Sequence, residues 1–293
     1  MKRRPGPRTL RRWSLIGARR GPARLLPVPV ILALLGAAAP PSTVFPPRAV
    51  GALTGSAFAA SVATLPDAER YAATRDQILA GNVPESLRMF VPVDIHRDGY
   101  PLVTVFVTTD YLSVGDDADY LTVPLDLSAA ADIAGALGCV LPTTRIVDAV
   151  FNAAPLHLVP VPLPAGPQMR SIMYVIEHQA RILAERAGQA GGVLVAGTKK
   201  DLVLTGRLRG QPDREAIYGW HRPDGTPIQP LSLVHGVHYA DYSHGVRLVS
   251  DIVLVDGVPR GYFDALADPA VAPVISAEGA ILSARDLLPF TAP

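Results

Sequence analysis

The sequence of 293 residues contains a single cysteine, Cys139, and several other features are missing from it. One cysteine excludes an internal disulfide, so a folded domain must derive its stability from a hydrophobic core. No Gly-rich phosphate loop, internal repeat or coiled-coil heptad is present. No uninterrupted apolar run reaches the roughly 20 residues that a membrane-spanning helix needs. Acidic residues are absent from positions 1–59, which hold ten Lys or Arg.

The remaining residues are acidic. Without the ten basic residues of the first 59 positions, the chain has 17 basic and 26 acidic residues, a formal charge of −9. Such a domain repels the phosphates of nucleic acid, which excludes nucleic acid as a partner. Because 49% of the residues are hydrophobic, the chain can bury one sizeable core or two modest ones. We expect a single α+β globular domain over residues 60–293.

Residues 1–59 are predicted to be a targeting leader. They are Arg-rich as far as Arg24, and an apolar run broken by prolines follows at residues 25–39. This pattern favours a secretory signal peptide with a disordered leader; cleavage after Ala59 is preferred to cleavage after Ala39, which Pro40 follows. An uncleaved anchor is the alternative. We therefore expect an exported protein, in the periplasm, the cell wall or the extracellular space, that meets the membrane only through this signal.

Apolar periodicity predicts helices in the centre of the domain and strands on either side. Helices are expected at residues 67–81, 128–137, 142–153 and 168–186, and strands at 89–95, 102–108, 120–125, 192–196, 201–205, 215–220 and 246–255. Asp98-Gly99, between two β-branched runs, indicates a hairpin. The expected fold class is α+β, with central helices and an antiparallel C-terminal sheet, and a papain-like arrangement is one candidate.

The most unusual stretch covers residues 233–248. It holds His235, His238 and His244 together with Asp241, whereas the rest of the chain has only four histidines. Side chains that donate, accept or carry protons near neutral pH gather where a ligand, a metal or a reacting bond lies beside them. This stretch is therefore predicted to form one wall of a functional site.

Cys139 is the first candidate nucleophile. It lies just before a helix that Pro142 helps to start, so the positive end of the helix would lower the pKa of the thiol. His244 is then the predicted general base, and Asp241 or His235 the group that orients it. The competing interpretation of Cys139 is a small buried thiol that fills a corner of the core.

Five further side chains are predicted to hold the substrate. Lys200 or Arg247 would bind a carboxylate or another anion. Aromatic rings offer apolar faces with a polar rim, which suit a sugar or a peptide. The predicted substrate-binding residues are Lys200, Trp220, His221, Tyr242 and Arg247.

The histidine stretch also resembles a metal-binding pattern at first sight. His235, His238, Asp241 and His244 recur every third residue, and each is an acceptable Zn²⁺ ligand. This spacing alternates faces on a strand and drifts around the axis of a helix, so we predict no metal and no other cofactor. A metal-dependent hydrolase stays open as an alternative, because two or three of these side chains could converge from a loop.

Two resemblances to known proteins follow from these residues. A helix-borne Cys followed by a sheet-borne His resembles the chain order of papain-like enzymes and of the bacterial NlpC/P60 cell-wall peptidases, although residues 138–142 read Gly-Cys-Val-Leu-Pro where NlpC/P60 proteins usually have Asp-Cys-Ser-Gly. The blocks at 138–143, 197–201, 218–221 and 241–247 resemble a group of exported bacterial proteins without an assigned function. That second resemblance implies a shared fold over residues 85–258 and no activity.

Together these patterns predict an exported hydrolase that cleaves an amide bond, of the peptide or cell-wall type, through Cys139 and His244. The alternatives are a non-catalytic envelope protein that binds a glycan or a peptide, and a metal-dependent hydrolase that uses the stretch from His235 to His244. The expected partner is a peptide, cell-wall or glycan substrate.

Overall fold

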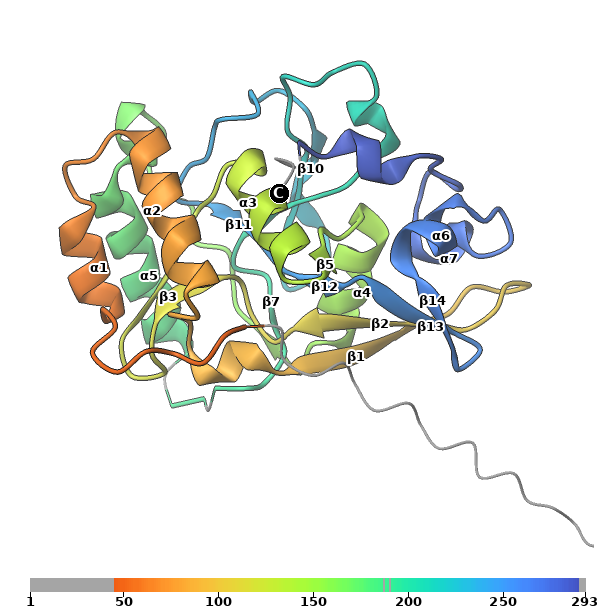
Figure 1. Cartoon of the computed structure of the whole chain (residues 1–293), viewed down its shortest axis with the longest axis horizontal. Coiled ribbons are helices and arrows are strands. Elements are labelled where there is room, and N and C mark those ends of the chain that lie inside the picture. The colour runs from red at the N-terminus through yellow and green to blue at the C-terminus, as the bar shows by residue number, and fades with distance from the viewer. Residues whose placement is uncertain (1–44, 187, 190, 290–293) are drawn as a thin grey trace, which may run out of the picture. The chain divides into compact units, whose positions relative to one another are not determined.

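The computed structural model describes residues 45–186, 188–189 and 191–289, and Figure 1 labels its main elements. The helices are α1 (Gly55–Ser61), α2 (Asp67–Leu79), α3 (Leu127–Ala136), α4 (Thr144–Ala153), α5 (Ile172–Arg186), α6 (Tyr262–Ala267) and α7 (Ala272–Ile275). The 3-10 helices are η1 (Glu85–Arg88), η2 (Pro167–Arg170), η3 (Gly206–Leu208) and η4 (Ala284–Leu287).

The strands are short, and most of them pair antiparallel. They are β1 (Phe90–Ile95), β2 (Val103–Thr108), β3 (Ser113–Gly115), β4 (Tyr120–Thr122), β5 (Cys139–Val140), β6 (Leu156–His157), β7 (Val195–Ala196), β8 (Lys200–Leu202), β9 (Ile217–His221), β10 (Pro227–Ser232), β11 (His244–Gly245), β12 (Val249–Ser250), β13 (Ile252–Val255) and β14 (Val258–Gly261). Helices and strands together confirm the α+β class predicted from the sequence.

Strand β2 is the centre of a six-stranded antiparallel sheet. The order is β14-β13-β2-β12-β5, and β1 pairs with the other edge of β2 from Phe90 opposite Thr108 to Ile95 opposite Val103. The predicted hairpin at residues 98–99 joins β1 to β2. Val103, Val105 and Val107 are fully buried, so the β-branched side chains of β2 form the middle of the main core.

A second sheet has the order β10-β9-β8-β11. Strand β8 pairs antiparallel with β9 but parallel with β11, where His244 lies opposite Lys200. The predicted antiparallel C-terminal sheet is therefore only partly correct, because its last pair is parallel. Most of residues 233–248 form turns rather than a strand, and only His244 and Gly245 join the ladder. Helix α4 packs against β1 of the first sheet and β9 of the second.

The packed part of the chain begins earlier than the expected residue 60. The predicted boundary at residue 59 falls inside α1, whose Phe58 is 2% exposed. Phe45 is also buried, and its carbonyl accepts a hydrogen bond from Arg88 (3.2 Å). Both phenylalanines belong to the main core, so residues 45–59 are part of the domain. The apolar run of the predicted signal lies outside the described residues, among which no helix is long and apolar enough to span a membrane.

Candidate functional site

The candidate site is a group of six side chains that we call the polar cluster. In a parallel strand pair, residues opposite each other point to the same face, so Lys200 and His244 leave the second sheet side by side. The segments before β9 and before β11 bring the other members to this face. The polar cluster consists of Lys200, Glu215, His235, Tyr239, Asp241 and His244.

His244 is the centre of the polar cluster and is 0% exposed. Its Nε2 lies 2.9 Å from Oε1 of Glu215, and its Nδ1 lies 3.2 Å from Oδ1 of Asp241. Burial alone would lower the pKa of the imidazole, but hydrogen bonds and negative charge from the two carboxylates raise it to about 9. The raised pKa favours the imidazolium at neutral pH, while the backbone N–H of Asp241 also points at Nδ1 from 3.1 Å. His244 stabilises two buried carboxylates and has no free nitrogen to act as a base.

A local turn holds Asp241 in place. Its Oδ1 accepts hydrogen bonds from the backbone N–H (2.8 Å) and the hydroxyl (2.5 Å) of Ser243, an Asx-turn that the spacing Asp-x-Ser favours. Its Oδ2 accepts the hydroxyl of Tyr239 (3.2 Å). Burial opposes ionisation of Asp241, yet the bonds to His244 and Ser243 hold its pKa well below the ordinary value. Asp241 is thus a carboxylate whose two oxygens are both occupied.

Glu215 lies just before β9 and is also 0% exposed. Burial raises its pKa, although His244 counteracts part of that effect. Only Oε1 has a partner; Oε2 is enclosed and makes no hydrogen bond to any described residue. A buried carboxylate oxygen without a hydrogen-bond donor costs free energy, so Oε2 of Glu215 is an unsatisfied acceptor of the polar cluster.

Lys200 lies over the ring of Trp220, with Nζ 5.3 Å from the ring centroid. Its ammonium makes no hydrogen bond and no ion pair within the described residues, and the residue is 9% exposed. Trp220 has φ of +55° and follows Gly219 with φ of +104°. A left-handed backbone at a bulky residue costs about 1–3 kcal/mol, and such strain concentrates at functional sites. Here it turns the indole under Lys200, with Nε1 enclosed and unpartnered.

The outer rim of the polar cluster is formed by two stacked rings. His235 and Tyr239 lie 4.0 Å apart at an interplanar angle of 8°, and both are half-buried. Their centroids lie 5.7 and 5.6 Å from that of His244. Burial, and then the positive charge of His244, lower the pKa of His235, so it is neutral at pH 7. The Arg170 guanidinium lies over the Tyr239 ring, 5.5 Å from its centroid, so the rim combines two neutral rings with a positive charge.

Three predicted substrate-binding residues have their polar atoms engaged in the fold. The Tyr242 hydroxyl accepts the backbone N–H of Leu163 (2.7 Å). Arg247 donates to the carbonyls of Thr108 and Val195, each at 2.6 Å, and its guanidinium lies over Tyr111. His221 Nε2 lies 2.9 Å from Oδ1 of Asp148, and its ring stacks on Phe151. None of these groups contacts the polar cluster directly; of the predicted binding residues, Lys200 belongs to it and Trp220 touches it.

Cys139 lies in β5, opposite Ser250 of β12, and is 3% exposed. The following helix begins only at Thr144, with the Thr143 hydroxyl capping it, so the thiol is not at a helix N-terminus. Burial, and then the charge of Asp251, raise the thiol pKa to about 12. The expected lowering of the pKa is therefore wrong. The one hydrogen bond of the thiol is to the carbonyl of Leu137, so the structure does not bring Cys139 and His244 together.

Sequence reasoning missed Glu215, which pairs with His244. The available signal was an acid immediately before the apolar strand Ala216-Ile217, a position where a solvent-exposed acid is unexpected. Lys199, the neighbour of the predicted Lys200, is also buried and is 1% exposed. No group of three His, Cys, Asp or Glu side chains within the described residues has an arrangement that could hold a metal ion.

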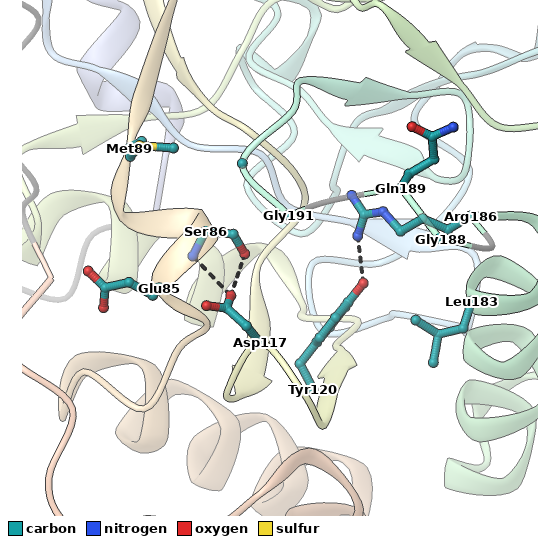
Figure 2. A pocket seen from close by; sticks show the side chains of 11 residues that line it. Glu85, Ser86, Met89, Asp117, Tyr120, Leu183, Arg186, Gly188, Gln189 and Gly191 are labelled. Carbon is teal, nitrogen blue, oxygen red and sulfur yellow. Dashed lines mark hydrogen bonds between the residues drawn. The ribbon is translucent and has the colours of Figure 1, made fainter.

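A cavity of about 470 Å³ lies elsewhere on the domain, between η1, the β3–β4 turn and the end of α5 (Figure 2). Its described lining includes Ser86, Asp117, Tyr120 and Arg186, and no member of the polar cluster. This cavity is therefore separate from the polar cluster.

Comparisons with known proteins assign no function to the polar cluster or to the cavity. No family model, no curated protein and no solved structure matches this chain. Its function therefore has to be inferred from the chemistry of its own side chains.

Proposed function

We propose that this is a non-catalytic protein of the cell envelope that binds a carboxylate-bearing peptide or glycan at the polar cluster. The observation that carries the proposal is Lys200, a largely buried ammonium that makes no hydrogen bond and no ion pair in the described part of the chain, although its charge acts on the carboxylate of Asp241. Removing an ammonium from water without pairing it costs free energy, and an ion pair with a ligand carboxylate would offset this cost.

The surroundings of Lys200 fit an anionic group. The carboxylates of Glu215 and Asp241 contact the adjacent His244, and no ion pair joins either of them to Lys200, although the charge of Lys200 helps to lower the pKa of Asp241. The stacked rings of His235 and Tyr239 offer a flat surface against which the rest of a sugar or peptide could lie. An anion on Lys200 and an apolar face on the rings would together fix the orientation of the ligand.

Binding is favoured over hydrolysis because Cys139 lacks the surroundings of a nucleophile. A papain-like site needs a thiolate beside an imidazolium, whereas burial raises the pKa of Cys139 to about 12 and the hydrogen bond of its thiol goes to the carbonyl of Leu137 rather than to His244. The Cys/His hydrolase with a papain-like arrangement stays a prediction. Export likewise rests on the predicted leader alone.

Trp220 provides the test, because the chain has only one other tryptophan, Trp13. In the full chain with Trp13→Phe, the fluorescence of Trp220 is titrated with N-acetylmuramyl dipeptide, which carries a free carboxylate, and with its amide. We expect the acid to change the fluorescence and the amide to bind about tenfold or more weakly, the value of one charged hydrogen bond.

Lys200→Met should abolish the response to the acid, whereas Arg222→Met, which removes one positive charge from an exposed turn, should leave it intact. Equal binding of acid and amide, or binding unaffected by Lys200→Met, would refute the proposal. Chromatography of the mixture checks for turnover: release of fragments that depends on Cys139 would restore the hydrolase prediction.

A further inference from the structure

The cavity in Figure 2 borders an apolar groove, with which it shares two lining residues. The groove has a volume of about 380 Å³ and lies between α1 and α5, which Figure 1 shows next to each other. Tyr120 and Leu183 line both the cavity and the groove. The two hollows are therefore neighbours that share one wall, with a polar end and an apolar end.

The apolar end is built from small residues on one helix and large ones on the other. Ala59, Ala60 and Ala63 leave space on the α1 side. On the α5 side, Met173 is 65% exposed and Leu183 is 44% exposed. Exposed large apolar side chains that gather in one groove indicate a binding surface. From Ile172 to Leu183 the helix rises by about 16 Å, which gives the groove room for an extended alkyl chain.

The polar end offers acceptors and excess negative charge. Asp117 Oδ1 accepts the backbone N–H (3.0 Å) and hydroxyl (2.7 Å) of Ser86, while no hydrogen bond from the described residues reaches its Oδ2. The positive charge of Arg186 is already paired with Asp110 at 2.9 Å. Asp119, at the apolar end, is ionised, since hydrogen bonds from Ser56 hold its pKa below the ordinary value. The charge balance therefore disfavours an anionic head group and favours hydrogen-bond donors.

From the shared wall of Tyr120 and Leu183 we infer that the cavity and groove form one site for a single-chain amphiphile, with the alkyl tail between α1 and α5 and a head group that donates hydrogen bonds and carries no negative charge. In Figure 2 the Tyr120 side chain lies between Asp117 and Arg186, and Arg186 donates to its hydroxyl at 2.5 Å. Tyr120 thus stands where head and tail would join. This site is separate from the polar cluster and does not depend on its proposed function.

The test uses the full chain and three ligands with the same dodecyl tail, each below the concentration at which micelles form: dodecylamine, dodecyl glucoside and laurate. Isothermal titration calorimetry should show binding of the ammonium and the glucoside, and about tenfold or weaker binding of laurate. Equal affinity for all three would overturn the assignment of the head group, and absence of binding for all three would overturn the site.

A matched pair of variants on α5 locates the tail. Ala180 lines the groove and Ala184 does not, although both are exposed on the same helix. Ala180→Phe should reduce the affinity for dodecylamine by about tenfold or more, while Ala184→Phe, with the same change in helix propensity, should leave it unchanged. Asp117→Asn should reduce the preference for dodecylamine over laurate. If Ala180→Phe changes the sedimentation coefficient of the protein but leaves amphiphile binding unchanged, the groove is an interface between protein chains and the inference is refuted.

Discussion

Lys199 and Lys200 share a peptide bond, but their ammonium groups lie in different environments. Nζ of Lys199 is 2.6 Å from the carbonyl of Tyr242 and 3.2 Å from Nδ1 of His178, and the residue is 1% exposed. Nζ of Lys200 has no such acceptor among the described residues and lies over Trp220. The same indole ring also packs edge-on against His178 and Tyr242. Trp220 thus lies between the polar cluster and a buried group of His178, Lys199 and Tyr242, which we call the cage.

The two buried histidines show the same contrast. His178 has its pKa lowered to about 2, first by burial and then by the charge of Lys199. His244 is at least as deeply buried, yet its pKa is raised to about 9 because two carboxylates contact it. Burial therefore sets the direction of a pKa shift only where no opposite charge is present. The cage supplies acceptors for its own lysine, whereas the polar cluster leaves Lys200 and one oxygen of Glu215 unpaired.

Removing the central imidazolium should have the largest effect on stability. In His244→Ala, Asp241 and Glu215 stay buried and lose their shared positive partner, which is expected to cost about 3–5 kcal/mol of unfolding free energy. Urea denaturation measures the loss. The control is His238→Ala: this side chain is 76% exposed beside Asp126, so its removal should change the free energy by no more than about 0.5 kcal/mol. Equal losses of unfolding free energy in the two variants would show that the group of Asp241, His244 and Glu215 does not stabilise the fold.

The pH dependence of stability should differ in sign between the two regions. His244 has a raised pKa, so its contribution is complete below its unfolded value of about 6.5 and is lost as the pH rises through about 9. Lys199 has a pKa lowered to about 7, first by burial, so the unfolded chain holds the extra proton between pH 7 and about 10.5 and stability rises with pH there.

Urea denaturation at pH 7, 8 and 9 can separate these two contributions. From pH 7 to 9, the stability of the unmodified chain relative to His244→Ala should fall, and its stability relative to Lys199→Met should rise. Each full proton of difference corresponds to about 1.4 kcal/mol per pH unit, so the opposite slopes are measurable. Slopes of the same sign would mean that one of the two sites does not hold its proton as described.

Much of the fold could be predicted because the signals are local. The helix start at Asp67 and the hairpin at residues 98–99 occur where expected, although Asp67 lies in the first turn of the helix and Pro66, rather than a capping acid, is the N-cap. His235, Asp241 and His244 come together because a short polar stretch has few ways to turn, and the Asp-x-Ser spacing fixes one of those turns.

The parts of the site that could not be predicted from the sequence depend on pairing between segments far apart in the chain. Lys200 lies beside His244 only because β8 and β11 pair in parallel across 43 residues of chain, which no local pattern encodes. Glu215 reaches His244 from a segment before β9, for the same reason. Cys139 was expected at a helix terminus because Pro142 often begins a helix, but residues 139–140 pair with β12 in the main sheet before α4 begins at Thr144.

Cys139 is buried, like the residues of the cage, so its removal should affect stability and little else. Cys139→Ala deletes one buried sulfur and is expected to cost about 1 kcal/mol, as small core truncations do. In the native chain, iodoacetamide should label the thiol only as fast as the domain unfolds. Rapid labelling near pH 7 that disappears in His244→Ala would contradict this expectation and place the two side chains in contact.

Lys200→Met should have the smallest effect on stability and thereby separates ligand binding from folding. Lys200 makes no hydrogen bond that the substitution would break, and a methionine side chain can keep the contact with the Trp220 ring. The unfolding free energy should change by no more than about 0.5 kcal/mol in urea denaturation, while the Trp220 fluorescence response to the carboxylated ligand is lost. A stability loss of several kcal/mol would instead show that the Lys200 ammonium stabilises the fold, and the polar cluster would then be a structural unit rather than a ligand site.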